Sequence, residues 1–194
     1  MADIYCYPGT DVLINLLNIK NDDDLRIAET ELTTRRCAQL QISPIHGRFD
    51  FTHLCAIHKH IFQDVYSWAG QIRNGDIAKG NTLFCLSQNI PTYAEEVFSS
   101  YYQDCFSARD DIQAFAHVLA DHYADVNCLH PFREGNGRTQ REFARELCLA
   151  CGYVFNLSHV NQKDMISASA SAYYGNIAKL EQIFEQALEP VRNK

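Results

Sequence analysis

The 194-residue sequence has a hydrophobic fraction of 46% and a formal net charge of −7 at pH 7. This length and composition fit one globular domain with a real hydrophobic core, and they exclude a disordered chain. The acidic balance argues against general attraction to nucleic acid or to an anionic membrane. We therefore expect neither a membrane nor a direct nucleic-acid partner.

The start of the sequence, MADIYCYPGT, lacks the basic segment and apolar run of a secretory signal. No apolar stretch approaches the roughly 18 residues that suggest a transmembrane helix. The eight cysteines are scattered, and the pair Cys148 and Cys151 has no second pair or nearby histidine to complete a zinc site. These features predict buried, reduced thiols in a cytoplasmic protein.

The spacing of apolar residues predicts a mostly helical chain. Suitable helix starts are the aspartates of residues 22–24, Pro91, and Asp110 or Asp111. Suitable helix ends are Gly70 and Gly152. In chain order, the expected helices cover residues 21–40, 51–70, 91–106, 110–129, 137–150, 162–173 and 176–188.

Residues 70–90 are the exception to the helical pattern. Asn74–Gly75 and Gly80–Asn81 are turn signals, and short alternating segments lie between them. We expect a β-hairpin or flap inserted into an all-α domain, and a loop of this length in a compact domain is usually functional.

The stretch HPFREGNGRTQR, residues 130–141, has the composition of an anion-binding loop. Pro131 should end the preceding helix, and Phe132 can anchor the loop to the core. Gly135 and Gly137 permit a close backbone path at the start of the next helix, where free N–H groups and the helix dipole favour negative charge.

Charged and titratable groups surround this loop. Arg138 and Arg141 are three residues apart and share one helix face, so both can reach an anion held there. Glu134 supplies a hard oxygen ligand for Mg²⁺, and His130 titrates near neutral pH. The combination suits transfer of a phosphorus-containing group, with His130 accepting the proton of an attacking hydroxyl. The simpler interpretation, a capped helix start with incidental charge, does not account for all of these groups together.

Residues 130–141 match every specified position of HPFx[D/E]GNGRxxR, the signature of the Fic family. SWAGQIR and DIAKGNTLFC resemble the flap hairpin of that family, and YPGTDVLINLLNI resembles the start of short bacterial Fic toxins. The resemblance spans nearly the whole chain and implies an all-α Fic fold, a helical bundle with a small β-hairpin flap near the active site. We therefore expect a single Fic domain over residues 1–194, with its core at about 50–155, its flap at about 72–90 and its active-site loop at 130–141.

The resemblance also implies an activity, that of a protein adenylyltransferase. Such an enzyme moves AMP from ATP to a Ser, Thr or Tyr hydroxyl of a target protein with the help of Mg²⁺. By this resemblance His130 is the base and Glu134 is the Mg²⁺ ligand. The remaining implied roles are an anion-binding nest at Gly135, Asn136 and Gly137, contacts to the β- and γ-phosphates by Arg138 and Arg141, and flap contacts to nucleotide and target by Lys79 and Gly80.

Two alternatives to adenylyl transfer stay open. The related Doc toxins carry lysine at the position of Gly137 and act as kinases, whereas glycine leaves room for the phosphates and favours nucleotidyl transfer. A Doc-like protein kinase is therefore one alternative, and a catalytically silent nucleotide-binding interaction module is the other. Lys79 could also be an ordinary solvated lysine of the hairpin.

The inhibitory motif of the family, [S/T]xxxE[G/N], is not found. The one S/T-x-x-x-E match is Thr92 to Glu96, which is followed by Val97 and lies just after the flap. The resemblance thus implies a toxin restrained by a small antitoxin that supplies an [S/T]xxxE[G/N] helix, with DNA gyrase or topoisomerase IV as the suggested target. A divergent internal brake is the alternative.

Other polar residues have simpler explanations. Among the histidines, His58 and His60 do not share a helix face, and the chain has no HExxH motif. We expect His53, His58, His60, His117 and His122 to lie in the core or on the surface. Tyr173, Tyr174 and Asn176 could approach the nucleotide base in a Fic fold, but ordinary packing explains them equally well.

Overall fold

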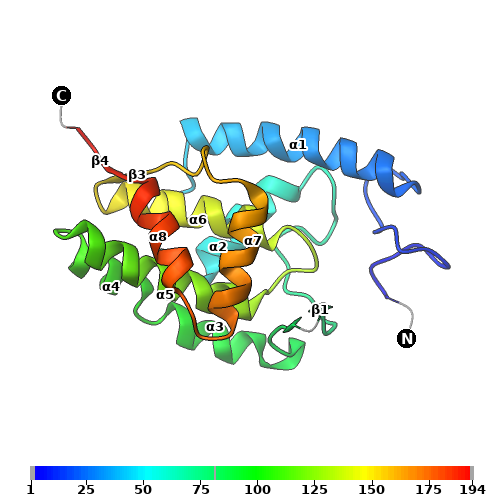
Figure 1. Cartoon of the computed structure of the whole chain (residues 1–194). Coiled ribbons are helices and arrows are strands. Elements are labelled where there is room, and N and C mark those ends of the chain that lie inside the picture. The colour runs from blue at the N-terminus through cyan, green and yellow to red at the C-terminus, as the bar shows by residue number, and fades with distance from the viewer. Residues whose placement is uncertain (1–2, 81, 193–194) are drawn as a thin grey trace.

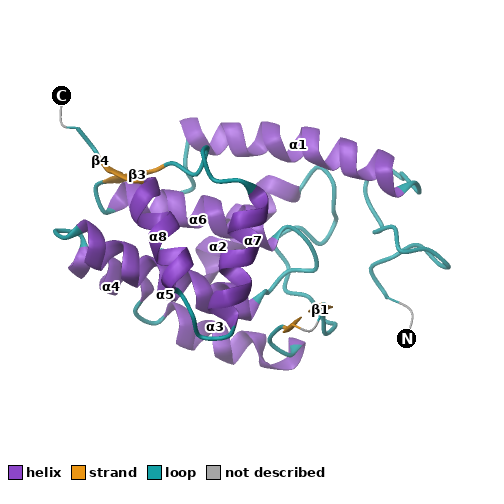
Figure 2. Cartoon of the chain, viewed as in Figure 1, coloured by secondary structure: helices purple, strands orange, loops and turns teal. Residues whose placement is uncertain are grey.

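The computed structural model describes residues 3–80 and 82–192. Its elements are α1 (Asp22–Ile42), α2 (Phe51–Phe62), β1 (Ala78–Lys79), β2 (Thr82–Leu83), the 3₁₀ helix η1 (Ser87–Asn89), α3 (Ile90–Phe98), α4 (Tyr101–Ala108), α5 (Ile112–Leu129), α6 (Asn136–Ala150), β3 (Tyr153–Phe155), α7 (Gln162–Tyr173), α8 (Ala178–Ala187) and β4 (Leu188–Pro190). Helices dominate, as Figure 2 shows, and the strands are two or three residues long. The predicted helical fold class is confirmed.

Helix α5 is the centre of the bundle. It contacts α3, α4, α6, α7 and α8, and it buries Phe115, Leu119, Tyr123 and Val126 at helical spacing. The Asp111 side chain accepts hydrogen bonds from the N–H groups of residues 113 and 114, so this helix begins where the sequence predicts. Its central position fixes the place of its C-terminal end, where the HPFREGNGRTQR loop begins.

Two predicted helices are shorter than expected. Helix α2 ends at Phe62 rather than near Gly70, because the Phe62 carbonyl accepts from the N–H groups of Val65 and Tyr66 and turns the chain. The predicted helix 91–106 is divided into α3 and α4 at a pair of serines. Ser99 donates to the Glu96 carbonyl at 2.7 Å, and such local bonds compete with helix continuation.

Helix α1 also begins differently in detail. Its N-cap is Asn21, whose side chain accepts from the Asp24 N–H, while the three aspartates occupy the first turn. They complement the helix dipole there instead of capping it.

The flap is smaller than the predicted segment. Ala78 pairs with Leu83 and Lys79 with Thr82 around Gly80, which has φ of +60°. Asn81, the other residue of this turn signal, lies outside the described residues. The second turn signal, Asn74–Gly75, precedes the hairpin and does not form its tip.

A second antiparallel pair, β3 with β4, was not predicted. Val154 pairs with Glu189, which is 35 positions later in the chain, so no local turn signal marks the pairing. Figure 1 shows this pair and the flap at opposite ends of the bundle, with α1 lying along one side. Within residues 3–80 and 82–192, none of the helices combines the length and apolar character needed to cross a membrane.

Candidate active site

His130 occupies the turn between α5 and α6. It caps α5 in the left-handed conformation, with φ of 43°, and its N–H donates to the Val126 carbonyl. Its Nδ1 lies 3.2 Å from the carbonyl oxygen of Asn127. Because a carbonyl only accepts, Nδ1 must carry the proton of the neutral ring, and Nε2 keeps its lone pair for a substrate proton.

The pKa of His130 is lowered to about 4. Burial of the ring is the main cause, and the positive charges of Arg73 and Lys79 act in the same direction, whereas the bond to Asn127 opposes them. The imidazole is therefore neutral at pH 7, which is the form that a general base requires.

Asn136 closes the loop that follows His130. Its Oδ1 accepts from the Phe132 N–H at 2.9 Å, and its Nδ2 donates to the Phe132 carbonyl at 2.7 Å. Phe132 is buried, and its ring stacks on that of His58 with centroids 3.8 Å apart. The Asn136 side chain thus holds the loop shape, so any contact of this residue with an anion must come from its backbone.

Gly135 is required by packing as well as by conformation. Its φ is +82°, and a Cβ there would lie 2.2 Å from Cζ of Phe62. Its N–H donates to the carboxylate of Glu134 at 2.7 Å. Gly137, by contrast, is exposed, and a Cβ there would meet Nη1 of Arg141 at 3.2 Å. Gly135 thus lets the backbone pass closely over the Phe62 ring, and Gly137 leaves the first turn of α6 without a side chain at that position.

His58 supports the loop from α2. Its Nδ1 accepts from the Gly70 N–H at 2.8 Å, so its Nε2 carries the proton that it donates to the Glu134 carbonyl at 3.0 Å. Desolvation lowers the pKa of this ring to about 4. His58 is buried, and through its bond to the Glu134 carbonyl it ties Glu134 to α2.

Arg138 is already bound by carboxylates. Its Nη2 lies 2.5 Å from Oε1 of Glu29 and 3.4 Å from Oε1 of Glu134, and Nη1 donates to Thr33. The Tyr66 hydroxyl donates to the other oxygen of Glu29. No local pattern marks Glu29 as a partner of Arg138, because the two residues are 109 positions apart in the chain.

Arg141 lines a cavity of about 220 Å³ together with Arg138 and Arg145. Phe155 contributes to the wall of this cavity. Arg145 pairs with Glu142 at 2.6 Å, whereas none of the ion pairs found in the described part of the chain includes Arg141. The structure therefore brings both predicted phosphate-binding arginines to one cavity, with the charge of Arg141 available.

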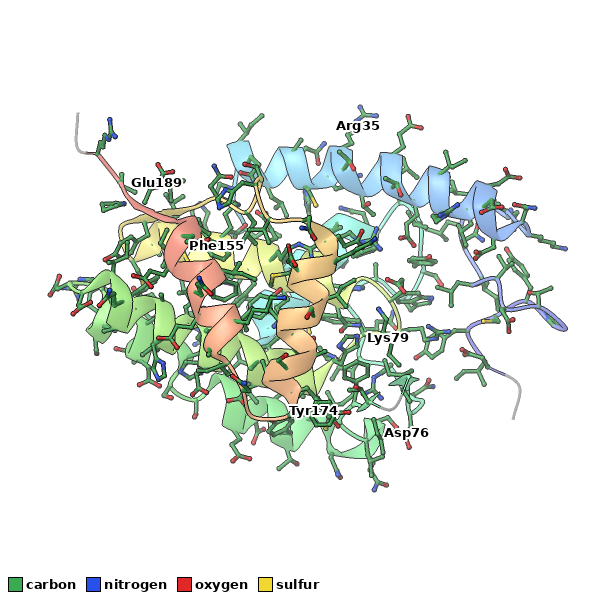
Figure 3. The ribbon with its side chains drawn as sticks, viewed as in Figure 1. Arg35, Asp76, Lys79, Phe155, Tyr174 and Glu189 are labelled. Carbon is green, nitrogen blue, oxygen red and sulfur yellow. The ribbon has the colours of Figure 1, made fainter. Side chains whose placement is uncertain are left out.

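The flap covers the histidine. The ring of Phe84, at the end of the hairpin, stacks on that of His130 with centroids 3.7 Å apart and planes at 15°. The Tyr173 hydroxyl donates to the Leu83 carbonyl at 2.6 Å, which ties the flap to α7. Lys79 is exposed, and Figure 3 shows it at the flap end of the molecule. Phe84 was missed, although a large apolar residue in a polar hairpin is a recognisable signal.

Among the cysteines, Cys37 lines the cavity of Arg138 and Arg141. All eight lie among the described residues as free thiols. Burial raises the pKa of Cys151 to about 11 and holds the pKa of Cys148 well above its ordinary value. The described residues contain no group of three or more His, Cys, Asp or Glu side chains arranged to hold a metal ion. The sequence predicts buried thiols, and Cys6, Cys105, Cys148 and Cys151 are buried, whereas the other four are half-buried.

The neutral base at the end of α5, the N-terminus of α6 and the two arginines that line one cavity are typical of a class of site that transfers phosphorus-containing groups. Residues 48–148 match the family model described as the Fic/DOC family. The chain therefore belongs to the Fic/DOC family.

Two of the relatives that align with most of this chain are named adenylyltransferases. The protein adenylyltransferase VbhT of Bartonella schoenbuchensis is 38% identical over 90% of this chain and 36% of its own length. The probable protein adenylyltransferase Fic of Salmonella typhimurium is 34% identical over 98% of this chain and 94% of its own. This chain thus spans about a third of the first relative and nearly all of the second. The family and the expected enzyme class, nucleotidyltransferase, are confirmed.

Solved structures show the same fold. The BepC protein of Bartonella tribocorum, solved with bound AMPPNP, superposes with a TM-score of 0.90 at 25% identity over 97% of each chain. The N-terminal Fic domain of a putative cell filamentation protein of Bartonella quintana, solved with bound ADP, gives a TM-score of 0.90 at 27% identity over 97% of this chain and 95% of that one. The predicted Fic fold is confirmed.

Proposed function

We propose that this chain transfers AMP from ATP to a Ser, Thr or Tyr hydroxyl of a target protein. The observation that carries the proposal is the neutral His130, whose free Nε2 lies in the loop that leads to Arg138 and Arg141. Relatives named protein adenylyltransferases and a structural neighbour with bound AMPPNP support it.

The proposed step balances as a displacement at the α-phosphorus. The target hydroxyl gives its proton to Nε2 of His130, and its oxygen forms a bond to the α-phosphorus of ATP. The bond between that phosphorus and the α,β-bridging oxygen breaks, and pyrophosphate leaves with the electron pair. Arg138 and Arg141 hold the β- and γ-phosphates, and the backbone of residues 135–137 contributes N–H groups.

Glu134 fits the role of Mg²⁺ ligand. Its side chain is about half exposed, and one carboxylate oxygen is free of the contacts to Gly135 and Arg138. Mg²⁺ is commonly held by one or two carboxylates together with substrate phosphates, so a single glutamate suffices. The ion would offset phosphate charge. Chelation should abolish transfer, and Glu134→Gln should raise the Mg²⁺ concentration needed for half-maximal rate.

The flap would guide the target segment. Lys79 and Gly80 belong to the hairpin whose last residues cover His130, so an extended peptide added to this hairpin would reach the histidine. Lys79 would then act on the nucleotide phosphates as a mobile point charge.

A separate antitoxin is part of the proposal. Thr92 and Glu96 lie in α3, which contributes nothing to the walls of the Arg141 cavity within the described residues. An [S/T]xxxE[G/N] helix from a small partner would present its glutamate to Arg141. The proposed target is DNA gyrase or topoisomerase IV, and the free thiols are consistent with a cytoplasmic location.

The experiment uses two labels. The purified chain is incubated with Mg²⁺, a bacterial lysate or purified gyrase or topoisomerase IV, and ATP labelled either at the α- or at the γ-phosphate. Adenylyl transfer labels protein from α-labelled ATP only, and His130→Ala abolishes the signal. Label from the γ-phosphate would establish the kinase alternative, and ATP binding without either label would establish the silent module.

A further inference from the structure

Arg73 is a buried cation at the base of the flap. Its exposed fraction is 2%, and none of the ion pairs within residues 3–80 and 82–192 includes it. Its guanidinium instead donates to three backbone carbonyls. Nε bonds that of His130 at 2.9 Å, Nη1 bonds that of Gly75 at 2.8 Å, and Nη2 bonds that of Cys85.

These acceptors come from both sides of the hairpin and from the catalytic loop. Gly75 precedes β1 and Cys85 follows β2, so one side chain closes the flap at its base. The Arg73 N–H also donates to the Pro131 carbonyl at 2.9 Å, which makes a second bond to the residues around the histidine. Flap and loop are therefore joined through one residue.

Burying a guanidinium without a carboxylate costs several kcal/mol, and only well-placed acceptors offset that cost. Desolvation accordingly lowers the pKa of Arg73. The planar guanidinium sets three carbonyls in a fixed arrangement, which the single ammonium of lysine does not reproduce. The arrangement includes His130 in a left-handed conformation that costs about 1–2 kcal/mol for a residue other than glycine.

We propose that Arg73 is a positioning residue, which fixes the His130 backbone and holds the flap so that Phe84 lies over the imidazole. This inference rests on the proposed function for its kinetic consequence, but the geometry can be tested without activity. Arg73 is not among the residues that line the cavity of Arg138 and Arg141, so the phosphate contacts proposed for those two arginines should not depend on it.

The variant Arg73→Ala tests the proposal. We expect kcat for AMP transfer to fall about 10- to 100-fold, because small misplacements of a catalytic group have effects of this size. The Kd for ATP should change less than about threefold, since Arg138 and Arg141 keep their positions and only the flap contact of Lys79 is affected. Guanidinium ion at millimolar concentration should restore part of kcat, and Arg73→Lys should not match the wild-type rate because it cannot bridge three carbonyls.

The control is Arg36→Ala. Arg36 of α1 makes a two-bond contact with Asp64 through Nε and Nη2, and neither residue belongs to the flap or to the loop, so this variant reports how stability alone affects activity. The proposal would be overturned if Arg73→Ala lost no more kcat than Arg36→Ala. It would also be overturned if guanidinium restored none of the lost rate.

Hydrogen exchange gives a readout that is independent of catalysis. Two amides report on the flap and the loop: the Cys85 N–H, which is bonded to the Cys128 carbonyl, and the Arg73 N–H. If one opening motion exposes both to solvent, they should exchange in the unaltered protein with equal protection and equal dependence on denaturant. Independent opening of the two amides would contradict the proposal even if Arg73→Ala does not fold. If the unaltered protein transfers no AMP, the proposed function fails while the exchange result still decides the role of Arg73.

Discussion

Glu29 of α1 and Arg138 of α6 form an ion pair with Oε1 and Nη2 2.5 Å apart. The Glu29 side chain is 12% exposed, and the Tyr66 hydroxyl holds its second oxygen. Arg138, which we propose as a phosphate ligand, is thus bound by a carboxylate of the same chain. A phosphate that binds Arg138 must share or displace this contact.

The variant Glu29→Gln should therefore bind ATP more tightly. Removing the competing charge should lower the Kd about 3- to 10-fold, the size expected for one partly buried ion pair. Calorimetric titration with ATP and Mg²⁺ measures this change. Glu31→Gln, on an exposed position of the same helix, should leave the Kd unchanged. A weaker affinity in Glu29→Gln would show that Glu29 orients Arg138 instead of competing for it.

The rate of AMP transfer should be insensitive to pH between about 6 and 8. His130 has a pKa of about 4, and its neutral form is the base, so the rate falls only as pH drops toward that pKa. The pH dependence of kcat, measured above the pH at which the protein unfolds, tests this. An ordinary histidine would instead lose half its activity near pH 6.5.

Phe84→Ala should move this pH dependence. Removing the stacked ring hydrates His130 and raises its pKa toward the ordinary value, so the acid loss of kcat should begin at higher pH. Leu83→Ala is the matched control, because Leu83 is the neighbour of Phe84 in the chain and is 53% exposed. Identical pH profiles for Phe84→Ala and the unaltered protein would show that the ring does not control the hydration of His130.

Gly135→Ala and Gly152→Ala should differ strongly in stability. Both glycines have positive φ, so alanine costs about 1–2 kcal/mol at either position. At Gly152 nothing lies within 4 Å of the added Cβ, whereas at Gly135 the Cβ overlaps the Phe62 ring. Overpacking should add about 1–3 kcal/mol there, and urea unfolding measures the difference. Equal losses would mean that the Phe62 ring moves aside without cost.

Local pattern was enough to predict most helices and the loop. Asp111 with the apolar spacing after it defines α5, and residues 162–173 have the bounds of α7 as predicted. The family signature also indicated His130 and Glu134 in the loop and both arginines in the first turns of the helix that follows. These features were readable because each depends on residues within a few positions of one another.

The remaining features depend on contacts between distant segments. The sequence placed Arg138 at the start of a helix, but only the packing of α1 on the bundle brings Glu29 against it. Likewise the sequence indicated a flap, and only the tertiary structure laid Phe84 on His130 and buried Arg73 beneath the hairpin. Local pattern alone was sufficient to predict most helix positions, the loop and the chemical groups available for the reaction. The protonation state of the base and the partners of the arginines were decided by tertiary structure, because burial and charge proximity arise only when the chain is folded.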